Sequence, residues 1–126
     1  MILMKDDLAN QIKSVIDNWR DALQSQVDRK DIIAINFGIQ KVIDGFELYL
    51  SGHKWFDGHD LWLLDKYWTP SKNFITLGKY TSNYERLLVL ETLEKVIVDE
   101  LKQHIKVYDN VIVTVGLADS VYKRLK

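Results

Sequence analysis

The stretch HKWFDGHDLWLLDKYW, residues 53–68, gathers most of the side chains in this chain that could carry out chemistry. Its sixteen positions hold three of the four tryptophans, two of the three histidines and three aspartates. Side chains of these types can bind a metal, catalyse a reaction, fill a core or form a surface that binds another protein. The choice among these four roles decides most of what the sequence says about function.

A metal site is one possibility, because His53, Asp57, His59 and Asp60 are ligand types that zinc and iron accept. Their spacing matches none of the common metal-binding motifs, and the third histidine, His104, lies far along the chain in a predicted helix. The chain has no cysteine, which excludes a cysteine-based zinc site. We therefore expect a solvated polar loop that holds no metal and no cofactor.

Catalysis by this loop finds little support in the motifs. The chain has no Gly-x-Ser-x-Gly and no glycine-rich phosphate loop, and Ser51 lies at the end of a predicted strand. Glu47, Asp57 and Asp60 could form a carboxylate pair for acid–base catalysis, but carboxylates in exposed turns are common. We predict that the chain is not an enzyme. The alternative is a small hydrolase or metal-dependent enzyme that uses the His53–Asp60 loop.

The aromatic residues of the stretch are too closely spaced to enter a core together. Trp55 and Phe56 are adjacent, as are Tyr67 and Trp68, so in an extended chain one ring of each pair points away from the other. Outward rings beside carboxylates are typical of the anchors at protein–protein interfaces. Packing under a sheet stays open as the role of two or three of the rings.

The charges near the rings also favour a protein-binding surface. Between Asp44 and Asp65 there are five acidic residues and one lysine, in a chain whose net charge is −1. An acidic, aromatic surface favours a basic partner and fast, electrostatically steered association. The residues that we predict to contact a partner are Glu47, Trp55, Phe56, Asp57, Asp60, Trp62, Asp65, Tyr67 and Trp68.

The rest of the sequence predicts the elements that position this stretch. Apolar residues recur at helical spacing, two β-rich runs flank Asp44-Gly45, and Ser82 to Glu85 has the form of a capping box at a helix start. The predicted order is α-β-β-β-α-β, with helices over 5–28 and 82–106 and strands over 32–43, 46–52, 73–78 and 110–118.

These elements predict one α+β domain over residues 1–126. We expect a single layer of mostly antiparallel sheet with the two long helices on one face. The loop over residues 53–70 then either covers the other face or presents its rings outward.

The composition limits the partners. Lysine and arginine number 17 against 18 aspartates and glutamates, so the net charge gives no general attraction for nucleic acid or anionic lipid. No stretch approaches the roughly 20 apolar residues of a membrane-spanning helix. We expect a cytoplasmic protein that binds neither nucleic acid nor membrane, and that could also self-associate.

Several motifs resemble a group of small bacterial immunity proteins of contact-dependent growth inhibition and polymorphic toxin systems. The resemblance covers roughly residues 36–120 and rests on GFELYLSG, the Trp-bearing acidic loop, a following proline, a long helix and a final strand. The matching positions are Phe46, Leu48, Tyr49, Leu50, Gly52, Trp62, Pro70, Val113, Val115, Gly116 and Asp119.

The resemblance implies stoichiometric binding to a cognate toxin domain, with a nuclease as the toxin class that an acidic surface fits best. In that function, acidic side chains replace substrate phosphates in a basic cleft, and tryptophan and tyrosine rings act as anchors. The sequence does not identify the toxin.

Overall fold

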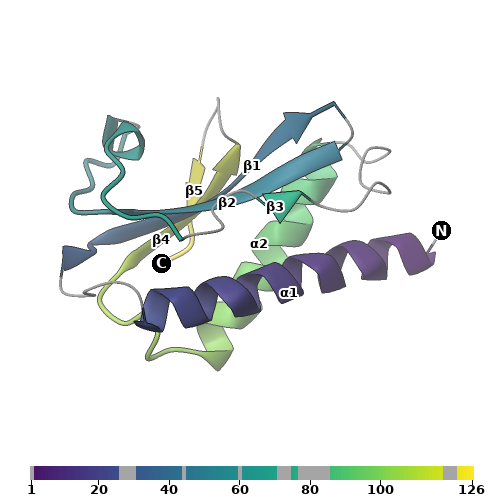
Figure 1. Cartoon of the computed structure of the whole chain (residues 1–126), viewed down its shortest axis with the longest axis horizontal. Coiled ribbons are helices and arrows are strands. Elements are labelled where there is room, and N and C mark those ends of the chain that lie inside the picture. The colour runs from purple at the N-terminus through teal and green to yellow at the C-terminus, as the bar shows by residue number, and fades with distance from the viewer. Residues whose placement is uncertain are drawn as a thin grey trace.

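The computed structural model describes residues 2–25, 31–43, 45–59, 61–70, 75–76, 86–117 and 122–126. The side chains of residues 2–7, 75–76 and 86 lie outside that description, as does the whole of the predicted capping box at Ser82 to Glu85. The elements are α1 (Ile2–Ser25), β1 (Ala34–Val42), β2 (Gly45–His53), the 3-10 helix η2 (Leu61–Leu64), β3 (Ile75–Thr76), α2 (Arg86–Gln103), β4 (Ile112–Leu117) and β5 (Tyr122–Arg124) (Figure 1).

The structure confirms the predicted α+β class and the order α-β-β-β-α-β. The sheet is mixed, with strand order β3-β2-β1-β4-β5, and β1 runs antiparallel to β2 but parallel to β4. The remaining neighbours, β2 with β3 and β4 with β5, are antiparallel. Strand β5 was not predicted, because three residues reading Tyr-Lys-Arg carry no strand pattern.

One face of the sheet, the helix face, lies against both helices. The apolar stripe of α1, which includes Ile12, Ile16 and Trp19, is buried, and Trp19 packs against Phe37 of β1 with ring centroids 6.3 Å apart. Leu93 and Ile97 of α2 belong to the same buried cluster. The apolar stripe of each helix and the alternate apolar residues of the strands therefore pack together in one core.

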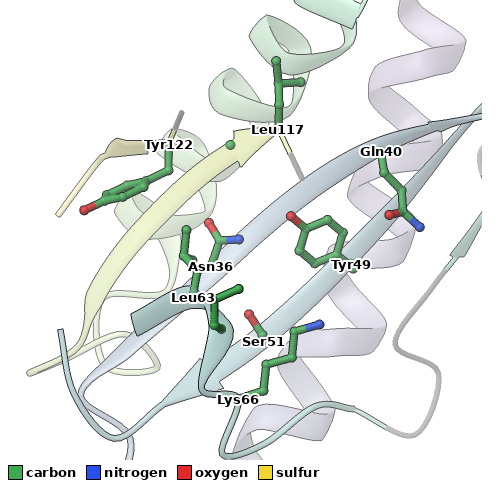
Figure 2. Close-up of a pocket in the computed structure, with 10 residues that line it drawn as sticks. Asn36, Gln40, Tyr49, Ser51, Leu63, Lys66, Leu117 and Tyr122 are labelled. Carbon is green, nitrogen blue, oxygen red and sulfur yellow. The ribbon is translucent and has the colours of Figure 1, made fainter. Parts of the chain in front are cut away.

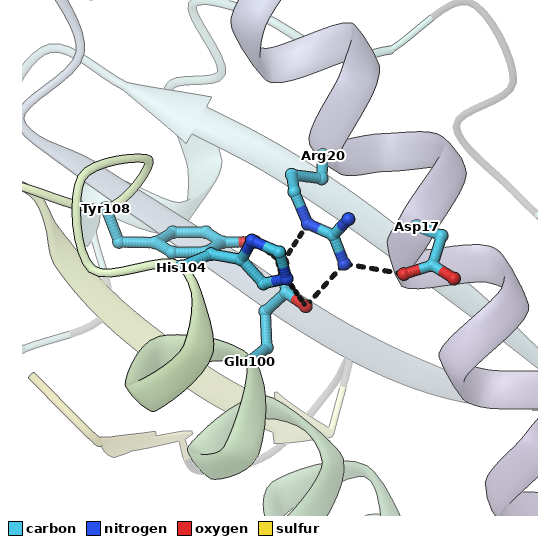
Figure 3. A network of polar contacts seen from close by, with 5 residues as sticks. All are labelled: Asp17, Arg20, Glu100, His104 and Tyr108. Carbon is cyan, nitrogen blue, oxygen red and sulfur yellow. Dashed lines mark hydrogen bonds and ion pairs between the residues drawn. The ribbon is translucent and has the colours of Figure 1, made fainter.

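A charged network fastens the two helices to each other (Figure 3). Arg20 of α1 donates from Nε and Nη2 to the two carboxylate oxygens of Glu100 in α2, at 2.6 and 2.7 Å. The hydroxyl of Tyr108, in the turn after α2, donates to Glu100 at 2.8 Å. The hydrogen bonds to Glu100 hold the pKa of Arg20 above its usual range, and a fork of two parallel bonds of this kind fixes geometry as well as charge.

The opposite face of the sheet, the open face, carries the even-numbered residues of β1. The register places Asn36 opposite Ser51, Gly38 opposite Tyr49 and Gln40 opposite Glu47. These residues are polar or small, and neither α1 nor α2 covers them (Figure 1). The segment between β2 and β3, which includes η2, covers part of this face (Figure 1).

Candidate functional site

The segment over residues 54–70 returns to the strand from which it leaves. The backbone N–H of Gly52 donates to the carbonyl of Trp68 at 2.7 Å, and the N–H of Tyr67 donates to the carbonyl of Gly52 at 2.9 Å. Trp68 is half-buried and packs against the core. Both ends of the loop are therefore fixed to β2.

The buried side chain of His53 fixes the position of the loop. Its Nδ1 bonds the backbone carbonyl of Asp65 at 3.0 Å, and its Nε2 lies 2.8 Å from the hydroxyl of Ser51. A carbonyl can only accept, so Nδ1 carries the proton, and Nε2 of the neutral ring accepts from Ser51. Burial lowers the pKa of His53, which favours this neutral form.

The Ser51–His53 pair bears on the alternative prediction, in which the chain is an enzyme that uses the His53–Asp60 loop. A serine that donates to histidine is part of the geometry of an activated nucleophile. The group that orients the histidine here is a backbone carbonyl, however, and not the carboxylate of a catalytic triad. Both ring nitrogens of His53 already have protein partners, and the described residues contain no cluster of three or more His, Cys, Asp or Glu side chains that could hold a metal.

Trp62 lies inside the molecule, under the loop. Its ring is 0% exposed and meets His53, Phe56 and Tyr122 edge-on, with centroid distances of 4.6, 5.0 and 5.5 Å. Its Nε1 donates to the carbonyl of His59 at 3.1 Å. We predicted Trp62 as a partner contact, but a ring with no exposed surface cannot contact a partner, and it serves instead as the core of the loop.

Phe56 lies partly in the core of the loop and partly at its surface. Its ring is half-buried against Trp62 and Tyr122, and the guanidinium of Arg124 lies over it at 5.5 Å. The edge-on rings and the cation over an aromatic face together fasten the loop to β5. Only the outer side of Phe56 is therefore available to a partner.

Trp55 and Tyr67 are the exposed rings of the predicted surface, at 37% and 41% exposure. Each is held by a carboxylate: Trp55 Nε1 donates to Asp65 at 2.8 Å, and the Tyr67 hydroxyl donates to Asp31 at 3.2 Å. The ammonium of Lys54 lies 4.3 Å from the centroid of the Tyr67 ring. The two rings thus lie at the surface in fixed orientations.

The acidic residues of the prediction that the structure describes do not all lie together. Asp57 accepts a hydrogen bond from the backbone N–H of His59 at 2.8 Å and so stabilises a turn. Glu47 accepts from Gln40 at 2.8 Å and lies six residues along β2 from His53, about 20 Å away. Asp60 and Asp44 lie outside the described residues. Lys54 and Lys66 add positive charge, so the described part of the surface carries both signs.

The open face also contains a pocket that the sequence analysis missed (Figure 2). This sheet-face pocket has a volume of about 250 Å³ and lies between the strands and the loop. Its lining residues are Asn36, Gln40, Tyr49, Ser51, Leu63, Leu64, Lys66, Gly116, Leu117 and Tyr122. The one signal in the sequence was the alternation that places polar or small residues on one side of two paired strands.

Comparisons with known proteins add no assignment. No protein-family model, no curated protein and no solved structure matches this chain. The helices among the described residues include none that is long and apolar enough to cross a membrane.

Proposed function

We propose that this chain is an immunity protein that binds and neutralises a cognate toxin domain through the surface formed by Trp55, Tyr67 and the loop between them. The family resemblance of the strand and loop motifs suggests the toxin as the partner. The chain acts by stoichiometric binding and not by catalysis. A nuclease domain is the first toxin class to test, because nucleases have basic clefts that acidic side chains can fill.

The observation that carries the proposal is the fixed position of the two exposed rings. Large aromatic side chains supply most of the binding energy at many interfaces, and an anchor that is already held in place loses little entropy on binding. Trp55 is fixed by Asp65, and Tyr67 by Asp31 and Lys54.

Exposed leucines near the rings add apolar area. Leu61 and Leu64, at the two ends of η2, are both exposed, and Leu64 immediately precedes the Asp65 that holds Trp55. Aromatic anchors with aliphatic neighbours and mixed charges at the rim match the usual anatomy of a protein interface. Because both signs of charge are present, paired contacts rather than net charge would decide which toxin is recognised.

Co-expression with the toxin domain encoded by the gene directly upstream provides the test. Wild-type chain should protect cells from that domain and should bind it in a one-to-one complex. Trp55→Ala and Tyr67→Ala should each weaken binding by about 2 kcal/mol, which is roughly thirtyfold in affinity. Binding and circular dichroism would be measured on the same preparations, so that loss of folding is separated from loss of contact.

The matched control is Ile105→Ala. Ile105 is also a large exposed hydrophobic residue, but it lies in the turn after α2, away from the loop. Its truncation should leave protection and affinity unchanged. If Trp55→Ala and Tyr67→Ala fold and still bind like wild type, the surface lies elsewhere; if no neighbouring toxin domain is bound, the immunity function is wrong.

A further inference from the structure

We propose that the sheet-face pocket binds a carboxamide group carried on a short aliphatic chain. This inference goes beyond the toxin-binding function and does not depend on it. It rests on two buried polar side chains that line the pocket, Asn36 and Ser51, which are 3% and 1% exposed. Each of them has a fixed hydrogen-bonding role.

Ser51 can offer only an acceptor to the pocket. Its hydroxyl proton is donated to Nε2 of His53, because Nδ1 of that ring carries the ring proton and donates to the carbonyl of Asp65. A hydroxyl has one proton and two lone pairs, so its lone pairs are what remain for a ligand. The loop, through Asp65 and His53, therefore sets the polarity of Ser51.

Asn36 offers the pocket a donor. Its Oδ1 accepts a hydrogen bond from the hydroxyl of Thr114 at 2.7 Å, which fixes the orientation of the amide. Its Nδ2 has no acceptor among the described residues. Figure 2 shows this nitrogen on the side of Tyr49 and the oxygen on the side of Tyr122. A buried amide N–H without an acceptor costs stability, which a ligand that supplies an acceptor would restore.

The donor and the acceptor lie side by side. Asn36 of β1 and Ser51 of β2 are directly opposite each other in the register, so their Cβ atoms are about 5 Å apart. A carboxamide has the complementary pair on one group: its C=O accepts from Asn36, and its NH₂ donates to Ser51. A carboxylate has no proton for Ser51, and an ammonium has no acceptor for Asn36.

The rest of the pocket fits a short aliphatic chain. Gly116 lines the pocket and brings no side chain into it, whereas the Tyr49 ring occupies the space above Gly38, its neighbour in the register. Leu63, Leu64 and Leu117 supply apolar walls. Lys66 also lines the pocket, with its ammonium 5.7 Å from the centroid of the Tyr49 ring, so a cation is present for a ligand that also carries a negative group.

Two small molecules that differ in one group test the proposal on the wild-type chain. The monoamide of glutaric acid carries the carboxamide, three methylenes and a carboxylate, whereas glutarate has a carboxylate in place of the carboxamide. In ¹⁵N–¹H spectra, the monoamide should cause saturable shifts at residues 36, 51 and 116, and glutarate should bind at least about tenfold more weakly. Equal binding of the two, or no saturable shift with the monoamide, overturns the proposal.

Variants locate the contact. Asn36→Asp keeps the shape of the side chain but removes the donor, and should weaken binding of the monoamide at least about tenfold. Asn18→Asp is the matched control, since it makes the same change at an exposed position of α1 and should leave binding unchanged. If Asn36→Asp does not fold, the comparison of the two ligands on the wild-type chain decides alone.

Tripeptides distinguish a free ligand from a side chain of a bound protein. If the carboxamide that binds in nature is the side chain of a protein, Gly-Gln-Gly should shift the signals of the same pocket residues, and Gly-Glu-Gly should not. Binding of the monoamide without the tripeptide assigns the pocket to a free small molecule. Binding of neither amide contradicts the proposal and leaves the toxin-binding surface at Trp55 and Tyr67 untouched.

Discussion

Two buried polar clusters lie among the described residues, one between the helices and one on the open face of the sheet. They differ in charge and in whether every polar atom has a hydrogen-bond partner. Between the helices, the carboxylate of Glu100 accepts from both Arg20 and Tyr108, so each oxygen has a partner. On the open face, the groups are neutral, and Asn36 keeps an amide nitrogen without an acceptor among the described residues. A saturated cluster stabilises the fold, whereas an incomplete one beside a pocket is a place for a ligand.

The two clusters also differ in what they fix. The Arg20–Glu100 bridge joins the two helices through residues that are 80 positions apart in the sequence. The bonds of His53 instead fix a surface loop, and that loop carries both the exposed rings and one wall of the pocket. Disturbing the first cluster should therefore change global stability, while disturbing the second should change the loop and the pocket.

The largest expected effect is at the charged cluster. Arg20→Ala leaves the carboxylate of Glu100, 6% exposed, with Tyr108 as its main donor, and should lower the free energy of unfolding by about 3 kcal/mol. Urea denaturation followed by far-ultraviolet circular dichroism would measure the change. The control is Asp17→Ala: Asp17 also pairs with Arg20, but its side chain is 65% exposed, so the loss should stay below about 1 kcal/mol. Similar losses for the two variants would contradict the distinction.

The sequence was sufficient for the elements whose signal is local. Apolar spacing identified both helices, and the Asp-Gly turn between two β-rich runs identified the hairpin of β1 and β2. The end of the second helix was placed at residue 106 rather than at Gln103, because residues 104–110, which form turns, still carry some apolar residues. Helix ends of this kind are weakly specified by periodicity.

The site was less predictable, because it depends on contacts between distant residues. Within an irregular loop no period separates buried rings from exposed ones, and here Trp62 points inward while Trp55 points outward. The pocket needs Asn36, Ser51 and Thr114 to meet across three strands, which is a consequence of register. Register between β1 and β4 joins residues 78 apart, and the local sequence does not encode it.

A smaller effect should follow from filling the open face at Gly38. A methyl group added there would overlap the ring of Tyr49, which lies across the glycine from the neighbouring strand. Gly38→Ala should therefore destabilise the chain by about 1–3 kcal/mol, through displacement of the Tyr49 ring.

A double-mutant cycle separates this overlap from other costs of the alanine. In a Tyr49→Ala background the added methyl meets no ring, so Gly38→Ala should cost at least about 1 kcal/mol less than it does in the wild-type chain. Urea denaturation of the four proteins gives the coupling energy. Additive effects of the two substitutions would show that Tyr49 does not occupy the space above Gly38.

The smallest effect is a pH dependence that belongs to the open face alone. Burial lowers the pKa of His53, so the unfolded chain, in which histidine has a pKa of about 6.5, binds the proton more readily than the folded chain. The free energy of unfolding therefore has its full value above about pH 6.5, where the ring is neutral in both states, and falls as the pH drops below that value.

Urea denaturation between about pH 5 and pH 8 avoids most carboxylate titration and would show this decrease. His53→Asn should flatten the profile whatever its own stability, whereas Ser51→Ala, which keeps the buried ring, should retain the slope. If the wild-type chain and His53→Asn lose stability equally between about pH 6.5 and pH 5, His53 is not the group that opposes protonation, and the fixed polarity of Ser51 in the pocket loses its support.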